Sequence, residues 1–260
     1  MGLLQLFSKK PVLDEQSIDW LFDTFAWALR NFDAALFRDH TVLVQPSDRF
    51  FPGRVDSVAG MAALICDRVK EYAGLSHWPT RLLDGRQCQL EATPQLLLQG
   101  PARSPSGVAP TQVEEGERLP ILYDPALINN PEAMIASFAH TFAHYLGTLA
   151  QESPPGGEEN WPHITELLAT FLGFGLIMAN SAFNVRIPRC GSCAPQPVDR
   201  QSFLSQYDLT YALAIFCELK GIPRGEVLPH LKGSLRGYYK QALKDVAGRT
   251  DELARLRAIV

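Results

Sequence analysis

Two stretches of the chain predict the centre of its fold: Ser137-Phe-Ala-His-Thr-Phe-Ala-His-Tyr-Leu-Gly147 and Thr165-Glu-Leu-Leu-Ala-Thr-Phe-Leu-Gly-Phe-Gly175. The first has apolar residues at helical spacing on one side and polar residues on the other, which is typical of an amphipathic helix. The second is apolar nearly all round, which indicates a helix buried on most sides. The sequence Glu-Ser-Pro-Pro-Gly-Gly at 152–157 cannot continue a helix. We therefore expect the two helices to fold back on each other as an antiparallel pair.

The polar side of the first helix carries two histidines, His140 and His144, which stand one helical turn apart. Residues four apart lie on the same helix face, so the two imidazoles are placed to bind one metal ion. An i,i+4 histidine pair is a weak signal by itself, because an ordinary solvated helix face can carry one by chance.

One carboxylate, Glu166, lies within the second, apolar helix. A buried carboxylate is too costly to leave charged and alone, so it protonates, pairs or binds a metal. Antiparallel packing would bring Glu166 opposite His140 and His144, and two imidazoles with one carboxylate form the ligand set of many catalytic zinc sites. The alternative is a Glu166 near the start of its helix, partly solvated and stabilised by the helix dipole.

Over Leu119 to Asn180, about a quarter of the chain, the sequence resembles the zincin metallopeptidases whose third zinc ligand is an acidic residue on the next helix. The resemblance implies one zinc ion per chain, bound by His140, His144 and Glu166. It also implies that the strand before the histidine helix, Leu119 to Tyr123, aligns an extended peptide.

The chain departs from the zincin motif at Thr141, which stands where those enzymes carry the glutamate that acts as general base. A threonine hydroxyl cannot take a proton from metal-bound water as a carboxylate does, and general-base catalysis is typically worth 10² to 10⁴ in rate. A substitute base could come from Glu152, Glu158 or Glu159 in the connecting segment. We therefore expect a pseudo-metallopeptidase that acts as a binding or regulatory module and that still has the residues for zinc. The alternatives are a divergent zinc-dependent hydrolase that uses another base, and a metal-free structural or interaction protein.

Other residues are candidates for supporting roles. His163 is either an alternative ligand or partner of Glu166, or a surface histidine at a helix start. The hydroxyl of Tyr207 or Tyr211 would suit the oxyanion of a zinc peptidase, whereas an ordinary buried tyrosine is the simpler interpretation. Cys190 and Cys193 form a C-x-x-C pair, which is either an incidental or labile disulfide or part of a redox or metal site.

Composition limits the remaining function classes. The chain has 260 residues, of which 46% are hydrophobic and 20% charged, as in globular proteins. A net charge of −4 argues against a general nucleic-acid binder and favours a peptide or protein partner, although small basic patches occur near Arg224 and along Lys232 to Lys244. Five scattered cysteines without a secretory signal predict a cytoplasmic protein.

The longest apolar run, Leu167 to Ala179, is too short to span a bilayer, which predicts no transmembrane segment. The oligomeric state is open.

The predicted fold is α+β. Residues 1–125 would form an α/β part with a small sheet, residues 126–260 a helical part that carries the antiparallel helix pair, and the two would pack as one unit. Local patterns predict helices at 15–37, 57–72, 131–150, 162–183, 201–220, 225–246 and 250–259. The helix at 131–150 is expected to begin after Asn130 as N-cap, with Pro131 at its first position. They predict strands within 81–99 and at 119–123, a β-like run at 40–44, and loops at 101–117 and 186–199.

Overall fold

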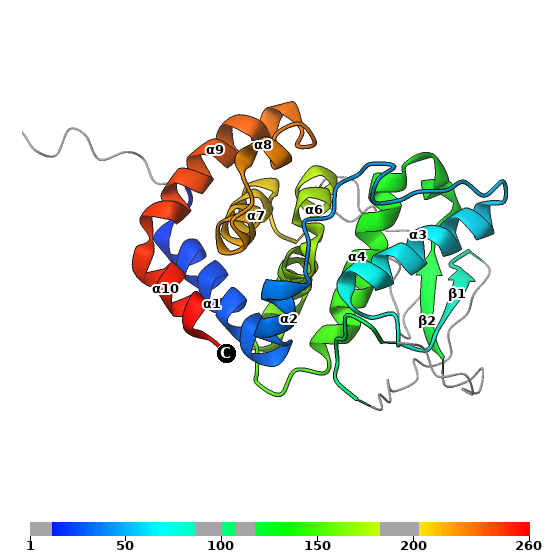
Figure 1. Cartoon of the computed structure of the whole chain (residues 1–260), viewed down its shortest axis with the longest axis horizontal. Helices are drawn as coiled ribbons and strands as arrows, with labels where there is room; N and C mark the ends of the chain where they lie inside the picture. The colour runs from blue at the N-terminus through cyan, green and yellow to red at the C-terminus, as the bar shows by residue number, and fades with distance from the viewer. Residues whose placement is uncertain (1–11, 87–99, 108–117, 183–202) are drawn as a thin grey trace, which may run out of the picture.

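A long apolar helical segment runs through the middle of the molecule (Figure 1). It consists of α5 (Trp161–Ala169), the π-helical turn η4 (Thr170–Phe174) and α6 (Gly175–Ser181). All residues from 164 to 182 are buried. A helix without a solvent-facing side needs neighbours all round. The neighbours are α1 (Glu15–Asn31), α3 (Val58–Ala73), α4 (Pro131–Gly147) and α7 (Gln206–Lys220).

The coordinates are a computed structural model, and they describe residues 12–86, 100–107, 118–182 and 203–260. The predicted pair of Cys190 and Cys193 lies outside these residues, as does the whole loop predicted at 186–199.

The first predicted helix is two helices, α1 (Glu15–Asn31) and α2 (Ala34–Asp39). The break falls at Asp33, whose positive φ of 65° no helix tolerates and whose side chain caps α2 by accepting the N–H of Leu36 at 2.8 Å. Next along the chain, α3 (Val58–Ala73) begins at the cap residue Ser57 and ends at Gly74 in the left-handed conformation. The β-like run predicted at 40–44 forms no strand, and His40 at its start is in the αR conformation.

The described sheet has two strands, β1 (Thr80–Asp84) and β2 (Leu119–Tyr123). They are parallel, with Thr80 opposite Leu119 and Asp84 opposite Tyr123. The sequence predicted a strand pair within 81–99, and the part of that range that is described pairs instead with the later strand. The sheet leads through the 3₁₀ turn η2 (Pro125–Asn129) into α4 (Pro131–Gly147).

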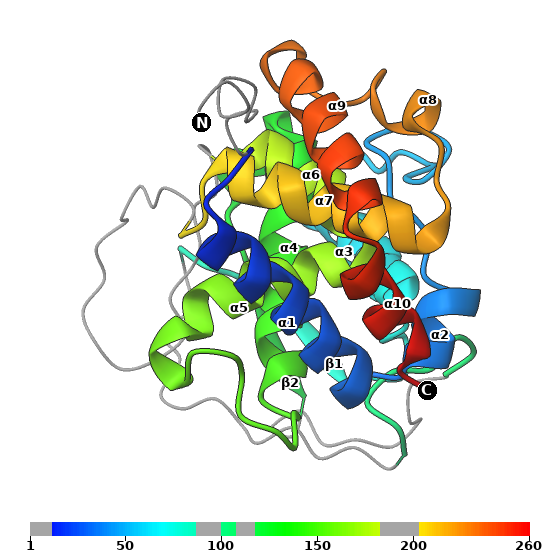
Figure 2. The ribbon, with the colours of Figure 1, turned by 90° about the vertical axis from the view of Figure 1, so that its left-hand side faces the viewer.

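The helices after α4 lie on the side of the molecule away from the sheet (Figure 1). After the 3₁₀ turn η3 (Glu158–Asn160) and the central segment come four more helices: α7 (Gln206–Lys220), α8 (Arg224–Val227), α9 (Gly233–Gly248) and α10 (Thr250–Ala258). In Figure 2, α9 and α10 lie at the front, and α10 packs against α1. The coarse prediction of an α+β fold with a helical C-terminal part is therefore confirmed.

By length and composition, the helical run from Glu158 to Ser181 could cross a membrane. Its most apolar stretch is entirely buried inside the protein, as is usual for the core helix of a globular fold. It is the one such helix among the described residues.

Gly173 allows the central segment to bend against the stretch at 41–44. Its φ of 100° lies in the left-handed region that favours glycine, and its carbonyl accepts the N–H of Val44 at 2.9 Å. A Cβ at this position would clash with the carbonyl oxygen of Val42. The bend and the passing chain therefore require glycine here.

We predict that Gly173→Ala lowers the free energy of unfolding by more than about 2 kcal/mol, because it combines a strained φ with a backbone clash in the core. Gly248→Ala is the matched control, since a Cβ there meets no atom within 4 Å. Urea denaturation of both variants measures the difference. Equal stability of Gly173→Ala and the wild type would contradict this account of the bend.

Candidate functional site

Helix α4 holds the two histidines, and its start follows the predicted capping pattern. The Asn130 side chain accepts the N–H of Ala133 at 3.2 Å, and Pro131 occupies the first helical position. His140 is only 8% exposed, so this side of α4 is not an ordinary solvated face. His144 is half-buried, and its ring lies edge-on to Trp161 of α5 with the centroids 6.4 Å apart. The histidine face therefore points toward α5.

The hydroxyl of Thr141 is bound within its own helix. Its Oγ1 donates a hydrogen bond to the Ser137 carbonyl at 3.0 Å. Threonine hydroxyls in helices often make this bond to the residue four positions earlier. A hydroxyl that already donates to the backbone, and that has no basic character near neutral pH, cannot replace a carboxylate as a proton acceptor.

Burial controls the charge state of His144. Loss of solvent around the ring lowers its pKa from the ordinary value of 6.5. The imidazole is therefore neutral near pH 7, which is the form that binds metal ions.

Glu166 lies on α5 and is 1% exposed, as predicted for a carboxylate in an apolar helix. Its Oε1 accepts the N–H of Phe203 at 2.9 Å and its Oε2 accepts the N–H of Leu204 at 2.8 Å. These charge-assisted hydrogen bonds hold the chain just before α7, where Ser205 begins the helix with a capping box. The carboxylate therefore has backbone partners that the sequence did not reveal.

The three predicted zinc ligands lie on two neighbouring helices, His140 and His144 on α4 and Glu166 on α5. Within the described ranges, no three His, Cys, Asp or Glu side chains lie close enough together to hold a metal ion. His140 and His144 share one helix face, while each oxygen of Glu166 faces a backbone N–H. A metal ion that used all three residues would therefore compete with the backbone N–H groups of Phe203 and Leu204 for Glu166.

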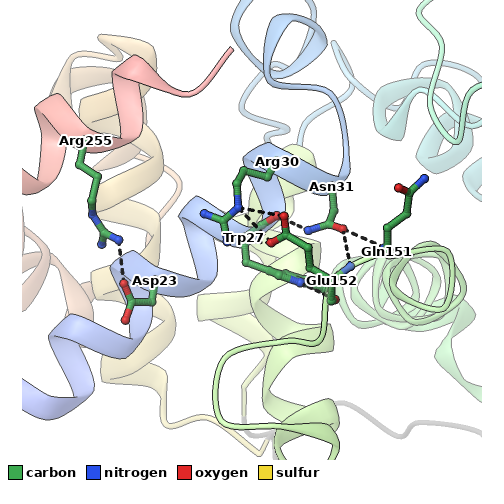
Figure 3. A network of polar contacts seen from close by, with 7 residues as sticks. All are labelled: Asp23, Trp27, Arg30, Asn31, Gln151, Glu152 and Arg255. Atoms are coloured by element: carbon green, nitrogen blue, oxygen red, sulfur yellow. Dashed lines mark hydrogen bonds and ion pairs between the residues drawn. The ribbon is translucent and has the colours of Figure 1, made fainter.

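The segment between α4 and α5 is fastened to α1, as Figure 3 shows. Glu152 forms an ion pair with Arg30 at 2.9 Å, and its carbonyl accepts the indole N–H of Trp27 at 2.9 Å. The side-chain oxygen of Asn31 accepts the N–H groups of Gln151 and Glu152 at 2.9 and 3.1 Å. Hydrogen bonding to Arg30 lowers the pKa of Glu152. Of the substitute bases predicted in this segment, Glu152 is thus held against α1 and made less basic.

His163 lies near the start of α5 rather than alone on the surface. Its ring contacts Trp20 and Phe203 edge-on, with centroid distances of 6.4 and 5.8 Å. Its Nδ1 is buried and has no hydrogen-bond partner in the described parts of the chain. The same ring lines an open cavity of about 310 Å³ between the starts of α1, α5 and α7.

The two tyrosines predicted to support the site point to α9. Tyr211 is fully buried and donates to Asp245 Oδ2 at 2.6 Å. Tyr207 is 44% exposed, and its ring lies 4.8 Å from that of Tyr238. Each tyrosine therefore has a structural explanation.

Two cysteines in the described residues are free and buried, Cys66 and Cys217. Burial raises the pKa of each thiol to about 12. They are therefore unreactive core residues.

No family model matches this chain, and no significant match to it was found among curated proteins or among solved structures.

We predict that His144 makes the protein less stable in mild acid. Its pKa is lower in the folded than in the unfolded chain, so the unfolded chain binds the proton more tightly. The free energy of unfolding should therefore fall as the pH drops below about 6.5, until the folded pKa is reached. Urea denaturation between pH 8 and 5, in buffer with a metal chelator, should give a weaker pH dependence for His144→Gln than for the wild type. Identical pH profiles would refute the prediction.

We predict that Glu166→Gln lowers the free energy of unfolding by about 1.5–3 kcal/mol, because a neutral amide can accept only one of the two N–H groups and brings its own NH₂ toward the other. The exposed Glu159→Gln is the control and should change stability by less than about 0.5 kcal/mol. Hydrogen exchange should show faster exchange at the amides of Phe203 and Leu204 in Glu166→Gln alone. Unchanged protection of these amides would mean that the carboxylate does not hold them.

Proposed function

We propose that the protein is a zincin-like, non-catalytic module that binds or regulates a peptide or protein partner in the cytoplasm. In this proposal α4 and α5 correspond to the antiparallel helix pair of a zincin, and the peptidase chemistry has been lost. The zincin resemblance over Leu119 to Asn180 suggests the ancestry.

The main support for this proposal is the hydrogen bonding of the Thr141 hydroxyl. Its hydroxyl occupies the position of the general base and donates to the Ser137 carbonyl at 3.0 Å. A peptidase of this class needs a carboxylate at that point to activate water. A threonine at this position supports a binding role for the protein and not a hydrolytic one.

The connecting segment supports the same conclusion. A divergent hydrolase would need another base close to the histidines, and Glu152 is paired with Arg30 on α1. Glu158 and Glu159 are exposed in the turn before α5. Neither arrangement favours the alternative of a hydrolase with a substitute base.

Zinc binding is a separate, second candidate, because Thr141 would not be a metal ligand. The neutral state of the His144 imidazole near pH 7 favours it. His140 and His144 would be the ligands, and Glu166 would join them only in competition with the N–H groups of Phe203 and Leu204. A zinc ion bound there would act as a structural ion in a protein without its general base.

We expect the wild-type protein to show no peptidase activity on casein or on a fluorogenic peptide library, with or without added zinc. Purified without a metal-affinity column, it should take up about one zinc ion per chain on titration if the second candidate holds. His140→Ala should then remove that zinc without loss of the folded state, and mass spectrometry for metals measures both.

The outcomes separate the two candidates. Hydrolysis by the wild type that His144→Ala abolishes would overturn the non-catalytic proposal. Absence of zinc in every titration would discard the metal site and leave the binding role standing. Thr141→Glu provides a further check, because a gain of zinc-dependent hydrolysis would show that only the base is missing.

A further inference from the structure

Helix α9 presents a row of positive charges to solvent. Lys232 at its N-cap is followed at intervals of four residues by Arg236, Lys240 and Lys244, and all four are exposed. Residues four apart lie on one side of a helix, so the charges form a continuous stripe, named here the α9 ridge. Figure 2 shows α9 at the front of the molecule, on its outer side.

Several other cations in the described chain form ion pairs, and the members of the α9 ridge do not. Arg30, Arg68, Arg249 and Arg255 each form an ion pair with a carboxylate. Within the residues that the structure covers, no ion pair involves a member of the ridge. Arg236 donates only to the backbone carbonyls of Leu231 and Pro229. The positive charge of the ridge is thus not neutralised from within the described fold.

The ridge also works against the stability of its own helix. Like charges at i,i+4 destabilise a helix, and each cation of the ridge stands four residues from the next. Gly237, in the middle of α9 and on the same exposed side, lowers helix propensity further. A Cβ at Gly237 would meet no atom within 4 Å, so internal packing does not require glycine there. Residues that lower the stability of a helix and are not required by its packing are typical of functional surfaces.

We propose that the α9 ridge is the docking surface for an acidic protein segment, a helix with carboxylates at every fourth position. Four residues of helix rise about 6 Å, so such a helix would bring one carboxylate to each cation, and Gly237 would let its backbone come close. The net charge of −4 opposes polyanions such as nucleic acids and acidic membranes, which favours a partner of lower charge density. This inference is independent of the α4 and α5 helices and of any metal.

The test uses the full-length protein and a fluorescein-labelled helical peptide with glutamate at every fourth position. Fluorescence anisotropy should show binding that weakens as salt rises from 50 to 300 mM. Lys240→Glu/Lys244→Glu should weaken it at least about tenfold, because two attractions become repulsions. This variant should remain folded, because both substituted side chains are exposed on the surface of α9.

The matched control is Arg49→Glu/Arg54→Glu, which makes the same change in net charge at exposed positions away from α9. It should alter the affinity less than about twofold. The proposal is overturned if the peptide does not bind, or if both double variants weaken binding equally. Tighter binding to phosphatidylserine vesicles or to an oligonucleotide than to the peptide would also overturn it, as would self-association through the ridge in sedimentation.

Discussion

The rest of the structure depends on covering one helical segment that has no polar side. Residues 164–182 are buried throughout, so the fold must place a neighbour against each face. Helices α1, α3 and α4, which precede this segment in the chain, and α7, which follows it, cover it. Even the bend at Gly173 follows from this demand, because the chain at Val42 to Val44 packs directly against the helix backbone. The arrangement also explains why the histidine face of α4 is turned inward.

Glu166 is the charged exception in this apolar segment, and its surroundings change how the candidate site is interpreted. A buried carboxylate needs hydrogen bonds or an opposite charge, and two backbone N–H groups just before α7 supply hydrogen bonds. The same side chain can therefore be explained by the anchoring of α7 without a metal ion. The resemblance to zincins and the anchoring are not exclusive, because a carboxylate has lone pairs beyond those that two N–H groups use.

The structure of helix α4 does not depend on the residue that peptidase catalysis would require. The helix that would carry a zinc-peptidase motif is intact, capped at Asn130 and packed against α5. The motif departs from the zincin pattern that it resembles at Thr141, whose hydroxyl bonds to its own helix. Residues 151 and 152, in the segment that contains the predicted substitute bases, bind α1 through Trp27, Arg30 and Asn31. Under the proposal of a non-catalytic module, a partner would bind at the surface, where the cations of α9 form no ion pair within the described residues.

The sequence alone determined the features that rest on local patterns. Helical spacing, the Asn130 cap and the Pro-Pro-Gly-Gly stop located α4 to within a few residues, and uniform apolarity identified the buried helix that carries Glu166. The tertiary structure decided what depends on contacts between distant residues: the parallel pairing of β1 with β2, the bend at Gly173, the pairing of Glu152 with Arg30, and the N–H groups that meet Glu166. The physical reason is that periodicity and caps act within about one helical turn, whereas the partner of a buried polar group is chosen by how whole helices pack.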